Sequence, residues 1–209
     1  MKEVRIIPRE LTKDFILNIH YAHRMPSISW AFGLYENEEL IGVCTFGKPA
    51  SSNLQIGVCG KDYQSQVQEL NRLVLKYNKP NEASYFVSRC LKMLPKPMII
   101  ISYADTEQKH QGIIYQASNF IYTGLSAKRT DWKVRGMEHK HGFTIADEFR
   151  GIKNRSKAMK EKYGDDFYLK ARSRKHRYIY FIGSKTEKKR MREALNYKIQ
   201  DYPNQKVDT

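Results

Sequence analysis

The chain has few cysteines and no long apolar run. Its 209 residues include only Cys44, Cys59 and Cys90, and no Cys-x-x-Cys spacing occurs. An odd number of cysteines without that spacing argues against a disulfide framework or a zinc site, so we expect buried thiols in a reducing compartment. No hydrophobic stretch approaches the roughly 20 residues that span a bilayer, and the first ten residues lack a signal-peptide core. We therefore expect a cytoplasmic protein without membrane contact.

Internal repeats, heptad arrays and low-complexity segments are also missing. The glycines at 57–60 (GVCG) are too few for a phosphate-binding loop, and no His-Glu-x-x-His motif is present. Hydrophobic residues make up 41% and aromatic residues 12%, which is typical of a folded protein rather than a disordered one. We expect a single domain over residues 1–209 that ends in a polar tail at 196–209.

Positive charge is plentiful and unevenly distributed. The net charge is +15, with 14 Lys and Arg against 11 Asp and Glu in residues 1–127, and 23 against 11 in residues 128–209. The basic residues alternate with Tyr, Phe, Ser and Asn, which suits phosphate contact and base stacking, although a solvated charged surface is the alternative. We predict that a basic insertion at 128–175 contacts nucleic acid. Its expected contact residues, with one that follows it, are Lys128, Arg129, Arg155, Lys157, Arg172, Arg174, Lys175 and Arg177.

Hydrophobic periodicity predicts strands alternating with helices. Strands are expected at 4–8, 29–35, 40–46, 68–76, 98–102, 121–126 and 178–182, and helices at 10–20, 81–94, 113–120, 152–163 and 186–195. Residues 47–65 are expected to form an exposed loop with a short strand at 54–58. This order predicts an α/β fold with a mixed, largely antiparallel central sheet and helices on both faces.

One carboxylate stands out by its position. Met98–Ser102 has the pattern of a buried strand, and Asp105 follows it, close to Tyr103, His110 and Tyr115. Functional groups of open α/β sheets gather beyond the carboxyl ends of strands, so Asp105 is a candidate active-site residue. The alternative is a turn or helix-capping aspartate.

A second set of residues raises the question of a metal. His139 and His141 could join Asp105 in a two-histidine, one-carboxylate set of the kind that binds iron. The spacing does not require such a site, and the metal stays open.

The sequence resembles a known family in several blocks, in order along most of the chain. The element order is similar to that of GCN5-related acyltransferases, and the residues resemble the phage Mom family of adenine-modifying proteins. The blocks are IHYAHRMPS at 19–27, WAFGLYENEELIGVCTFGKPAS at 30–51, ELNRLVL at 69–75, ASYFVSRCLKMLPKP at 83–97, SYADTEQKHQGIIYQASNFIYTG at 102–124 and KHRYIYFIGSK at 175–185. The resemblance implies a transferase that gives adenine in phage DNA a carbamoylmethyl group on its exocyclic nitrogen and so protects it from host restriction.

The resemblance also implies a set of site residues. They are His20 and Tyr21 in IHY, Arg72 in ELNRL, Ser88 in FVSR, Asp105 in YADT and Tyr115 in IYQ. One departure from the acyltransferase pattern concerns the cofactor. Residues 73–86 contain no glycine, whereas coenzyme A users carry a glycine-rich loop there that binds pyrophosphate at a helix N-terminus.

The expected chemistry assigns roles to these side chains. The adenine amino group is a weak nucleophile that needs a base, and a base within duplex DNA must be flipped out to be reached. Asp105 is the predicted base, Arg72 a holder of phosphate or carboxylate, and Tyr21 and Tyr115 stacking partners or donors. Each of the last three could instead be an ordinary structural residue.

The donor and partners follow from the transferred group. A carbamoylmethyl group has the atoms of a glycine unit, so glycyl-tRNA is a candidate donor beside acetyl-coenzyme A. Double-stranded DNA, and with that donor tRNA, are the expected partners.

Three rival functions remain open. A nuclease could use Asp105 with Glu138 and Lys140, although the residues around Glu138 lack a strand pattern. A non-catalytic DNA-binding, anti-restriction protein would need only the basic region. The third rival is an acyltransferase, dependent on acyl-coenzyme A or aminoacyl-tRNA, that acts on another substrate.

Overall fold

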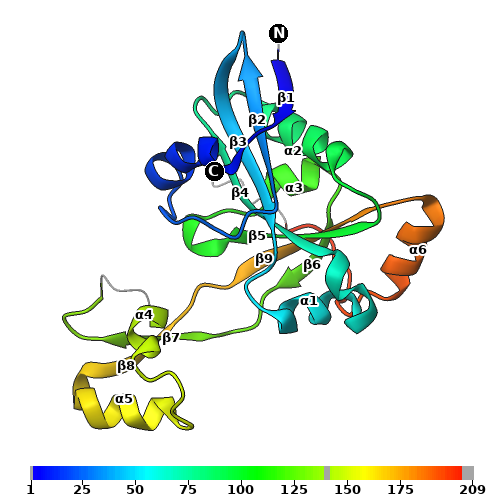
Figure 1. Ribbon diagram of the computed structural model, residues 1–209. Helices are drawn as coiled ribbons and strands as arrows, with labels where there is room; N and C mark the ends of the chain where they lie inside the picture. The colour runs from blue at the N-terminus through cyan, green and yellow to red at the C-terminus, as the bar shows by residue number, and fades with distance from the viewer. Residues whose placement is uncertain (1, 139–141, 204–209) are drawn as a thin grey trace, which may run out of the picture.

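The computed structural model describes residues 2–138 and 142–203, and its centre is a seven-stranded sheet (Figure 1). Neighbouring strands are antiparallel except β4 and β5, which are parallel. This confirms the predicted mixed, largely antiparallel sheet. In spatial order the strands are β1 (Lys2–Ile6), β2 (Trp30–Glu36), β3 (Glu39–Gly47), β4 (Val67–Leu75), β5 (Met98–Asp105), β9 (Lys175–Ile182) and β6 (Ile121–Leu125).

Helices cover both faces of this sheet, as predicted. On one face lie α2 (Glu82–Met93) and α3 (Ile113–Ala117), and on the other lie α1 (Ser52–Cys59) and α6 (Lys185–Glu193). The α2 side chains Phe86 and Cys90, one turn apart, are fully buried against even-numbered residues of β5 such as Ile100. Ile99 and Ile101 point to the opposite face and pack with Met191 of α6. Because β5 is buried on both faces, its sequence is an unbroken apolar run.

Two predicted segments differ in the structure. Residues 10–20 form two short helical turns, the 3₁₀-helix η1 (Arg9–Thr12) and the π-helical η2 (Phe15–Ile19), rather than one α-helix. The predicted loop with a strand at 54–58 was wrong, because this segment is the helix α1, followed by the 3₁₀-helix η3 (Lys61–Gln66). The Ser51 hydroxyl caps α1 by accepting the N–H of Leu54 at 3.3 Å, and Val58 is buried against the sheet.

Residues 130–138 and 142–171 form a small lobe between β6 and β9 that projects from the sheet (Figure 1), and we call it the insertion lobe. It contains β7 (Thr130–Val134), α4 (Gly142–Asp147), α5 (Arg155–Tyr163), the 3₁₀-helix η5 (Gly164–Asp166) and β8 (Phe167–Ala171). The two strands pair with each other and not with the main sheet. A separate apolar cluster holds the lobe together: Val134, Ile145, Phe149 and Met159. The predicted helix at 152–163 is present, but the two strands were not predicted.

The segment after α6 covers the edge of β6. The backbone N–H of Gln200 donates to the carbonyl of Tyr122 at 3.0 Å, and the Tyr202 hydroxyl donates to the carbonyl of Phe120 at 2.7 Å. These contacts hold the described part of the polar tail against the last strand of the sheet. No helix within the described ranges is both long and apolar enough to cross a bilayer.

Candidate active site

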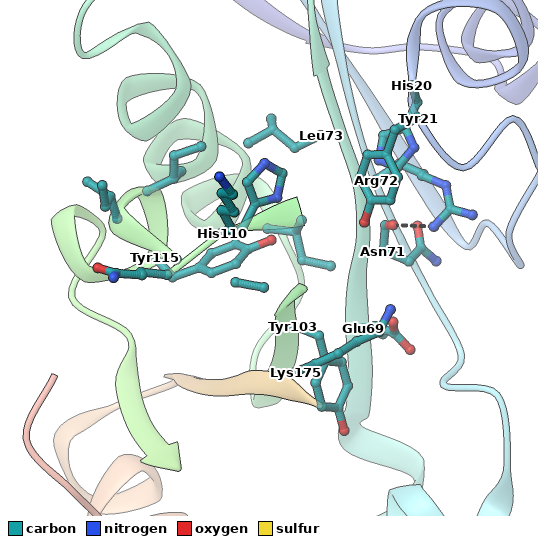
Figure 2. Close-up of a pocket in the computed structure, with 17 residues that line it drawn as sticks. His20, Tyr21, Glu69, Asn71, Arg72, Leu73, Tyr103, His110, Tyr115 and Lys175 are labelled. Atoms are coloured by element: carbon teal, nitrogen blue, oxygen red, sulfur yellow. Dashed lines mark hydrogen bonds between the residues drawn. The ribbon is translucent and has the colours of Figure 1, made fainter. Parts of the chain in front are cut away.

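A cavity of about 670 Å³ opens where β4 and β5 separate (Figure 2). The two strands pair from Val67 and Ile99 as far as Leu70 and Ser102. Beyond that point β4 stays paired with β3 and β5 stays paired with β9, so the strands diverge. The register of β3 and β4 also shifts at this point and leaves Asn71 as the extra residue of a β-bulge. The local loss of pairing creates the space.

Most of the predicted site residues line this cavity. His20, Tyr21, Arg72 and Tyr115 are among them, together with Lys175, which was predicted to contact nucleic acid. They come from the segment after η2, from β4, from α3 and from the start of β9. The complete lining is His20, Tyr21, Glu69, Leu70, Asn71, Arg72, Leu73, Tyr103, Ala104, Lys109, His110, Gln111, Gly112, Ile113, Ile114, Tyr115 and Lys175.

Aromatic rings gather at the cavity. The Tyr21 ring stacks on His20 with ring centroids 4.4 Å apart, and it meets His110 edge-on at 6.1 Å. Tyr21 is 49% exposed, which leaves part of its surface available to a ligand. Figure 2 shows Tyr21 on the β4 side and Tyr115 reaching in from the side of α3.

His20 is a neutral imidazole. Burial, followed by the charge of Arg72, lowers the pKa of His20 to about 4. Its Nδ1 accepts the backbone N–H of Ala22 at 3.0 Å, so the proton of the neutral ring is on Nε2. His20 is therefore a hydrogen-bond donor at neutral pH.

Arg72 fixes the loop at 20–27. Its guanidinium donates to the carbonyls of Asn71 at 2.6 Å and Arg24 at 2.8 Å. Its Nε is buried and has no hydrogen-bond partner among the described residues. A buried donor without a partner costs free energy, so the position of Arg72 is maintained by its other contacts.

Tyr115 is positioned by packing. Its ring lies 5.4 Å from the ring of Phe120 and 5.3 Å from that of Tyr178, measured between centroids. Burial raises the pKa of Tyr115, so the hydroxyl stays protonated and can donate a hydrogen bond.

Asp105 lies outside the cavity lining. It ends β5 and caps the 3₁₀-helix η4 (Thr106–Gln108) by accepting the N–H of Glu107 at 3.1 Å. It also accepts the Ser173 hydroxyl at 2.8 Å and forms an ion pair with Lys175 at 2.9 Å. Burial alone would raise the pKa of Asp105, but the hydrogen bonds from Lys175, Ser173 and Glu107 together hold it below its usual value. The capping alternative therefore describes its geometry, and its catalytic role stays a prediction.

Ser88 also lies away from the cavity. It is a half-buried residue in the middle of α2 and is absent from the cavity lining. The sequence resemblance implies that Ser88 belongs to the site, but Ser88 is not among the residues that line the cavity.

The sequence analysis missed Glu69, which does line the cavity. It lies on β4 next to the last residue paired with β5, and it is half-buried. Burial raises the pKa of Glu69 to about 7, although the charges of Arg72 and Lys175 act in the opposite direction. The available signal was an acid inside ELNRLVL, a segment that otherwise has the pattern of a buried strand.

Three of the predicted basic residues are engaged within the main sheet. Arg174 donates to the carbonyl of Ser126 at 2.6 Å, and the Arg177 guanidinium lies 3.4 Å from the centroid of the Tyr197 ring. Lys175 pairs with Asp105. These contacts favour a structural role for the three side chains.

The other predicted basic residues lie at the surface of the insertion lobe or of its connections to the sheet. Arg172 is 3.8 Å from Asp131, and Lys128, Arg129, Arg155 and Lys157 are exposed. Because these cations are exposed, they are available to bind a polyanion.

The structure does not fit a pyrophosphate-bearing cofactor at the first turn of α2. The carboxylate of Glu82 is fully buried there and forms an ion pair with Lys2 at 2.5 Å. The two lysines of the preceding loop, Lys76 and Lys79, form ion pairs with Glu39 and Glu36 at 2.8 Å. A buried carboxylate in the first turn of the helix would repel an anionic ligand there.

The described residues assemble no group of three or more His, Cys, Asp or Glu side chains that could hold a metal ion. The histidines of the predicted iron set, His139 and His141, lie outside the described residues. Lys140 of the nuclease alternative lies outside them too. Both hypotheses stay untested.

Comparisons with known proteins give one sequence relative and several structural ones. A probable acetyltransferase from Staphylococcus epidermidis aligns with a TM-score of 0.47 and 12% identity, covering 87% of this chain and 99% of the other. A Bacillus subtilis acetyltransferase in complex with CoA gives 0.46 and 12%, with coverage of 87% and 99%. The methylcarbamoylase Mom of Escherichia phage Mu is 29% identical over 217 residues, covering 97% of this chain and 84% of the relative. A sequence model of the Mom protein family matches residues 2–204, and the chain therefore belongs to the Mom protein family.

Proposed function

We propose that this protein is a transferase that modifies DNA by attaching a glycine-sized, carbamoylmethyl group to the exocyclic N6 of adenine. One observation carries the proposal: a ring-lined cavity and a basic lobe lie at the same end of the sheet, where β5 ends and β9 begins. Lys175 lines the cavity and begins β9, the strand that returns from the insertion lobe. Similarity to the methylcarbamoylase of phage Mu supports the same class of reaction. The product would protect phage DNA from restriction in the host cytoplasm.

The cavity suits a flipped base. Its volume of about 670 Å³ lies within the range of roughly 300–1,000 Å³ that small-molecule sites occupy. Extruding a base costs about a few kcal/mol, and stacking on an aromatic side chain returns about 1–3 kcal/mol. The exposed face of Tyr21, with His110 beside it, provides such a stacking surface.

The insertion lobe would hold the duplex. Lys128 and Arg129 lie on the connection from β6, and Arg155 and Lys157 lie on α5. Cations along the lobe would contact phosphates on the flank of the base that enters the cavity. The lobe has its own apolar cluster, which allows its surface residues to serve binding without weakening the main core.

The donor we favour is a glycyl ester of tRNA. The buried carboxylate of Glu82 in the first turn of α2 argues against a donor held there by pyrophosphate. A glycyl group and a carbamoylmethyl group contain the same atoms, and an aminoacyl ester needs no pyrophosphate site. The Nε2–H of His20 would bind the donor's carbonyl oxygen.

Nucleoside analysis tests the function directly. DNA from cells that express the wild-type protein should contain deoxyadenosine heavier by one glycine-derived group, and an Arg72→Gln variant should lose most of that product. Unmodified DNA that nevertheless resists restriction would indicate the non-catalytic DNA-binding alternative. DNA cut in a magnesium-dependent way would indicate the nuclease.

A second assay identifies the donor. Purified protein and plasmid DNA are incubated with glycyl-tRNA carrying isotopically labelled glycine, and in parallel with acetyl-coenzyme A. Label in adenine supports the glycyl donor. Product from acetyl-coenzyme A alone would overturn it.

A further inference from the structure

We propose that Glu69, rather than Asp105, is the base that accepts the proton of the adenine amino group. This inference rests on the proposed function and assigns a catalytic residue to it. Four features of Glu69 support the inference: its position in the cavity, the free lone pairs of its carboxylate, the charges around it and its affinity for a proton.

Position comes first. Among the described residues that line the cavity, Glu69 is the sole acid. It lies on the stretch of β4 that is paired with β5, next to Leu70, the last residue of that pairing. Its side chain therefore lies where β4 and β5 begin to separate. Figure 2 shows it at the same end of the cavity as Tyr103 and Lys175.

Glu69 differs from Asp105 in that its carboxylate oxygens are available to a substrate. Asp105 already accepts from Ser173, from the N–H of Glu107 and from Lys175. Within the described part of the chain, no hydrogen bond or ion pair engages the Glu69 carboxylate, and it is acted on only by burial and by charges at longer range. A base must have a free lone pair in contact with the substrate.

The groups that face Glu69 come from its own strand, from β5 beside it and from β9 beyond β5. Arg72 lies further along β4, Tyr103 on β5 and Lys175 on β9. Lys175 is held by Asp105, so its ammonium neutralises Asp105 and also lowers the energy of a nearby ionised Glu69. Asp105 is thus a positioning residue that acts through Lys175.

The proton affinity of Glu69 suits a base at neutral pH. Burial raises its pKa to about 7, so about half of the molecules carry the carboxylate at that pH. A base works best when its pKa lies near the working pH, because it is then both ionised and strongly basic. Asp105, with a pKa below its usual value, would be a weaker base.

The proton transfer fits an acyl-transfer step. The N6 lone pair attacks the carbonyl carbon of the donor ester, the N–C bond forms, and one N6 proton moves to a Glu69 oxygen. The C–O bond to the donor then breaks, the leaving oxygen takes that electron pair, and the proton passes from Glu69 to it. The carboxylate is regenerated, and the products are N6-glycyl adenine and the free alcohol of the donor. N6-glycyl adenine is an isomer of the N6-carbamoylmethyl form, so its rearrangement to that form is a separate, later step.

Variants at one position test this assignment. Glu69→Gln should lower the modified deoxyadenosine in cellular DNA by about 100-fold or more, because general base catalysis contributes about 10²–10⁴-fold in rate. Glu69→Asp keeps the carboxylate but shortens its reach, so it should retain activity between those of the wild type and Glu69→Gln. The matched control is Glu193→Gln, which removes an exposed carboxylate on α6 and should modify DNA as the wild type does.

A second measurement separates a catalytic role from a structural one. Carboxyl ¹³C NMR of the whole protein, with the Glu69 signal assigned by its loss in Glu69→Gln, should show a titration midpoint near pH 7. A midpoint near the ordinary value for Glu, or full modification by a folded Glu69→Gln, would overturn the assignment. The wild-type product establishes the proposed function independently, so the failure of one does not imply the failure of the other.

Discussion

The ammonium of Lys175 lies 2.9 Å from a carboxylate oxygen of Asp105, and these are paired residues of β9 and β5. The contact connects the strand that returns from the insertion lobe with the strand that lines the cavity. It places a positive charge beside Glu69 and fixes the end of β5. The ion pair therefore joins the two parts of the molecule that the proposed function requires.

Replacing Asp105 tests the meaning of this ion pair. Asp105→Asn removes the charge but keeps an oxygen for the N–H of Glu107, so we expect a folded protein that is less stable by about 1–3 kcal/mol at pH 7. Because the folded-state pKa of Asp105 lies below its unfolded value, this stabilisation is present above about pH 4 and disappears as the pH falls further. Denaturant unfolding at pH 7 and at acidic pH measures both effects.

The matched control for Asp105 lies in the same turn. The side chain of Glu107 is exposed, and Glu107→Gln should leave the stability unchanged. We also expect Asp105→Asn to retain measurable DNA modification, since it acts through Lys175. Full loss of modification in Asp105→Asn, with full activity in Glu69→Gln, would reverse the two roles.

The sequence predicted the elements whose side chains repeat regularly. Phe86 and Cys90 lie four residues apart, and this spacing belongs to a helix with one buried face. The same spacing in Leu54 and Val58 was read as a strand, because five residues are too few to separate the two periods. The cap at Ser51 was the missed signal.

The site was predicted only in part because it depends on contacts between distant segments. An acid after a buried strand drew attention to Asp105, but its partners Ser173 and Lys175 come from about 70 residues later in the chain. Glu69 faces a cavity only because β4 and β5 separate after Leu70, and no local pattern indicates where two parallel strands part. The partners of Asp105 and the cavity position of Glu69 are therefore visible only in the tertiary structure.

Glu69 should give the protein a characteristic dependence of stability on pH. Its folded-state pKa of about 7 lies above the unfolded value, so folding becomes less favourable as the pH rises from about 4.5 to 7. Glu69→Gln removes this cost, and the variant should therefore be more stable than the wild type at pH 8 but not at pH 4. Thermal unfolding across this range measures it, and a constant difference between the two proteins would contradict the raised pKa.

Tyr21 should act mainly through its ring. Tyr21→Ala should lower adenine modification by roughly 5- to 150-fold, which corresponds to about 1–3 kcal/mol of lost stacking, while Tyr21→Phe keeps most activity. Stability should change little because the side chain is half exposed. Tyr77→Ala is the control, since Tyr77 is also exposed but lies outside the cavity lining. If Tyr21→Phe were as inactive as Tyr21→Ala, the hydroxyl and not the ring would be the functional group.

The last prediction concerns the exposed cations of α5 in the insertion lobe. Changing Arg155, Lys157 and Lys160 to Gln should weaken duplex binding and reduce the slope of log K against log salt by about 2–3, because each phosphate contact contributes about 0.9. The free energy of unfolding should stay close to that of the wild type, since the ion pair between Lys157 and Glu161 is exposed and 3.8 Å long. Binding to a short duplex at several salt concentrations measures the slope.

A second helix provides a charge-matched control for α5. Lys185, Lys188 and Lys189 are exposed on α6, which packs on the main sheet away from the insertion lobe (Figure 1), and changing them to Gln removes the same charge. If the lobe binds the duplex, this variant keeps a slope near that of the wild type. Equal loss in both variants would mean that net charge, rather than the lobe, attracts the DNA. By contrast, Arg174 contacts the carbonyl of Ser126 and Arg177 contacts the ring of Tyr197. Replacing these two arginines should therefore lower the free energy of unfolding and leave the salt slope close to that of the wild type.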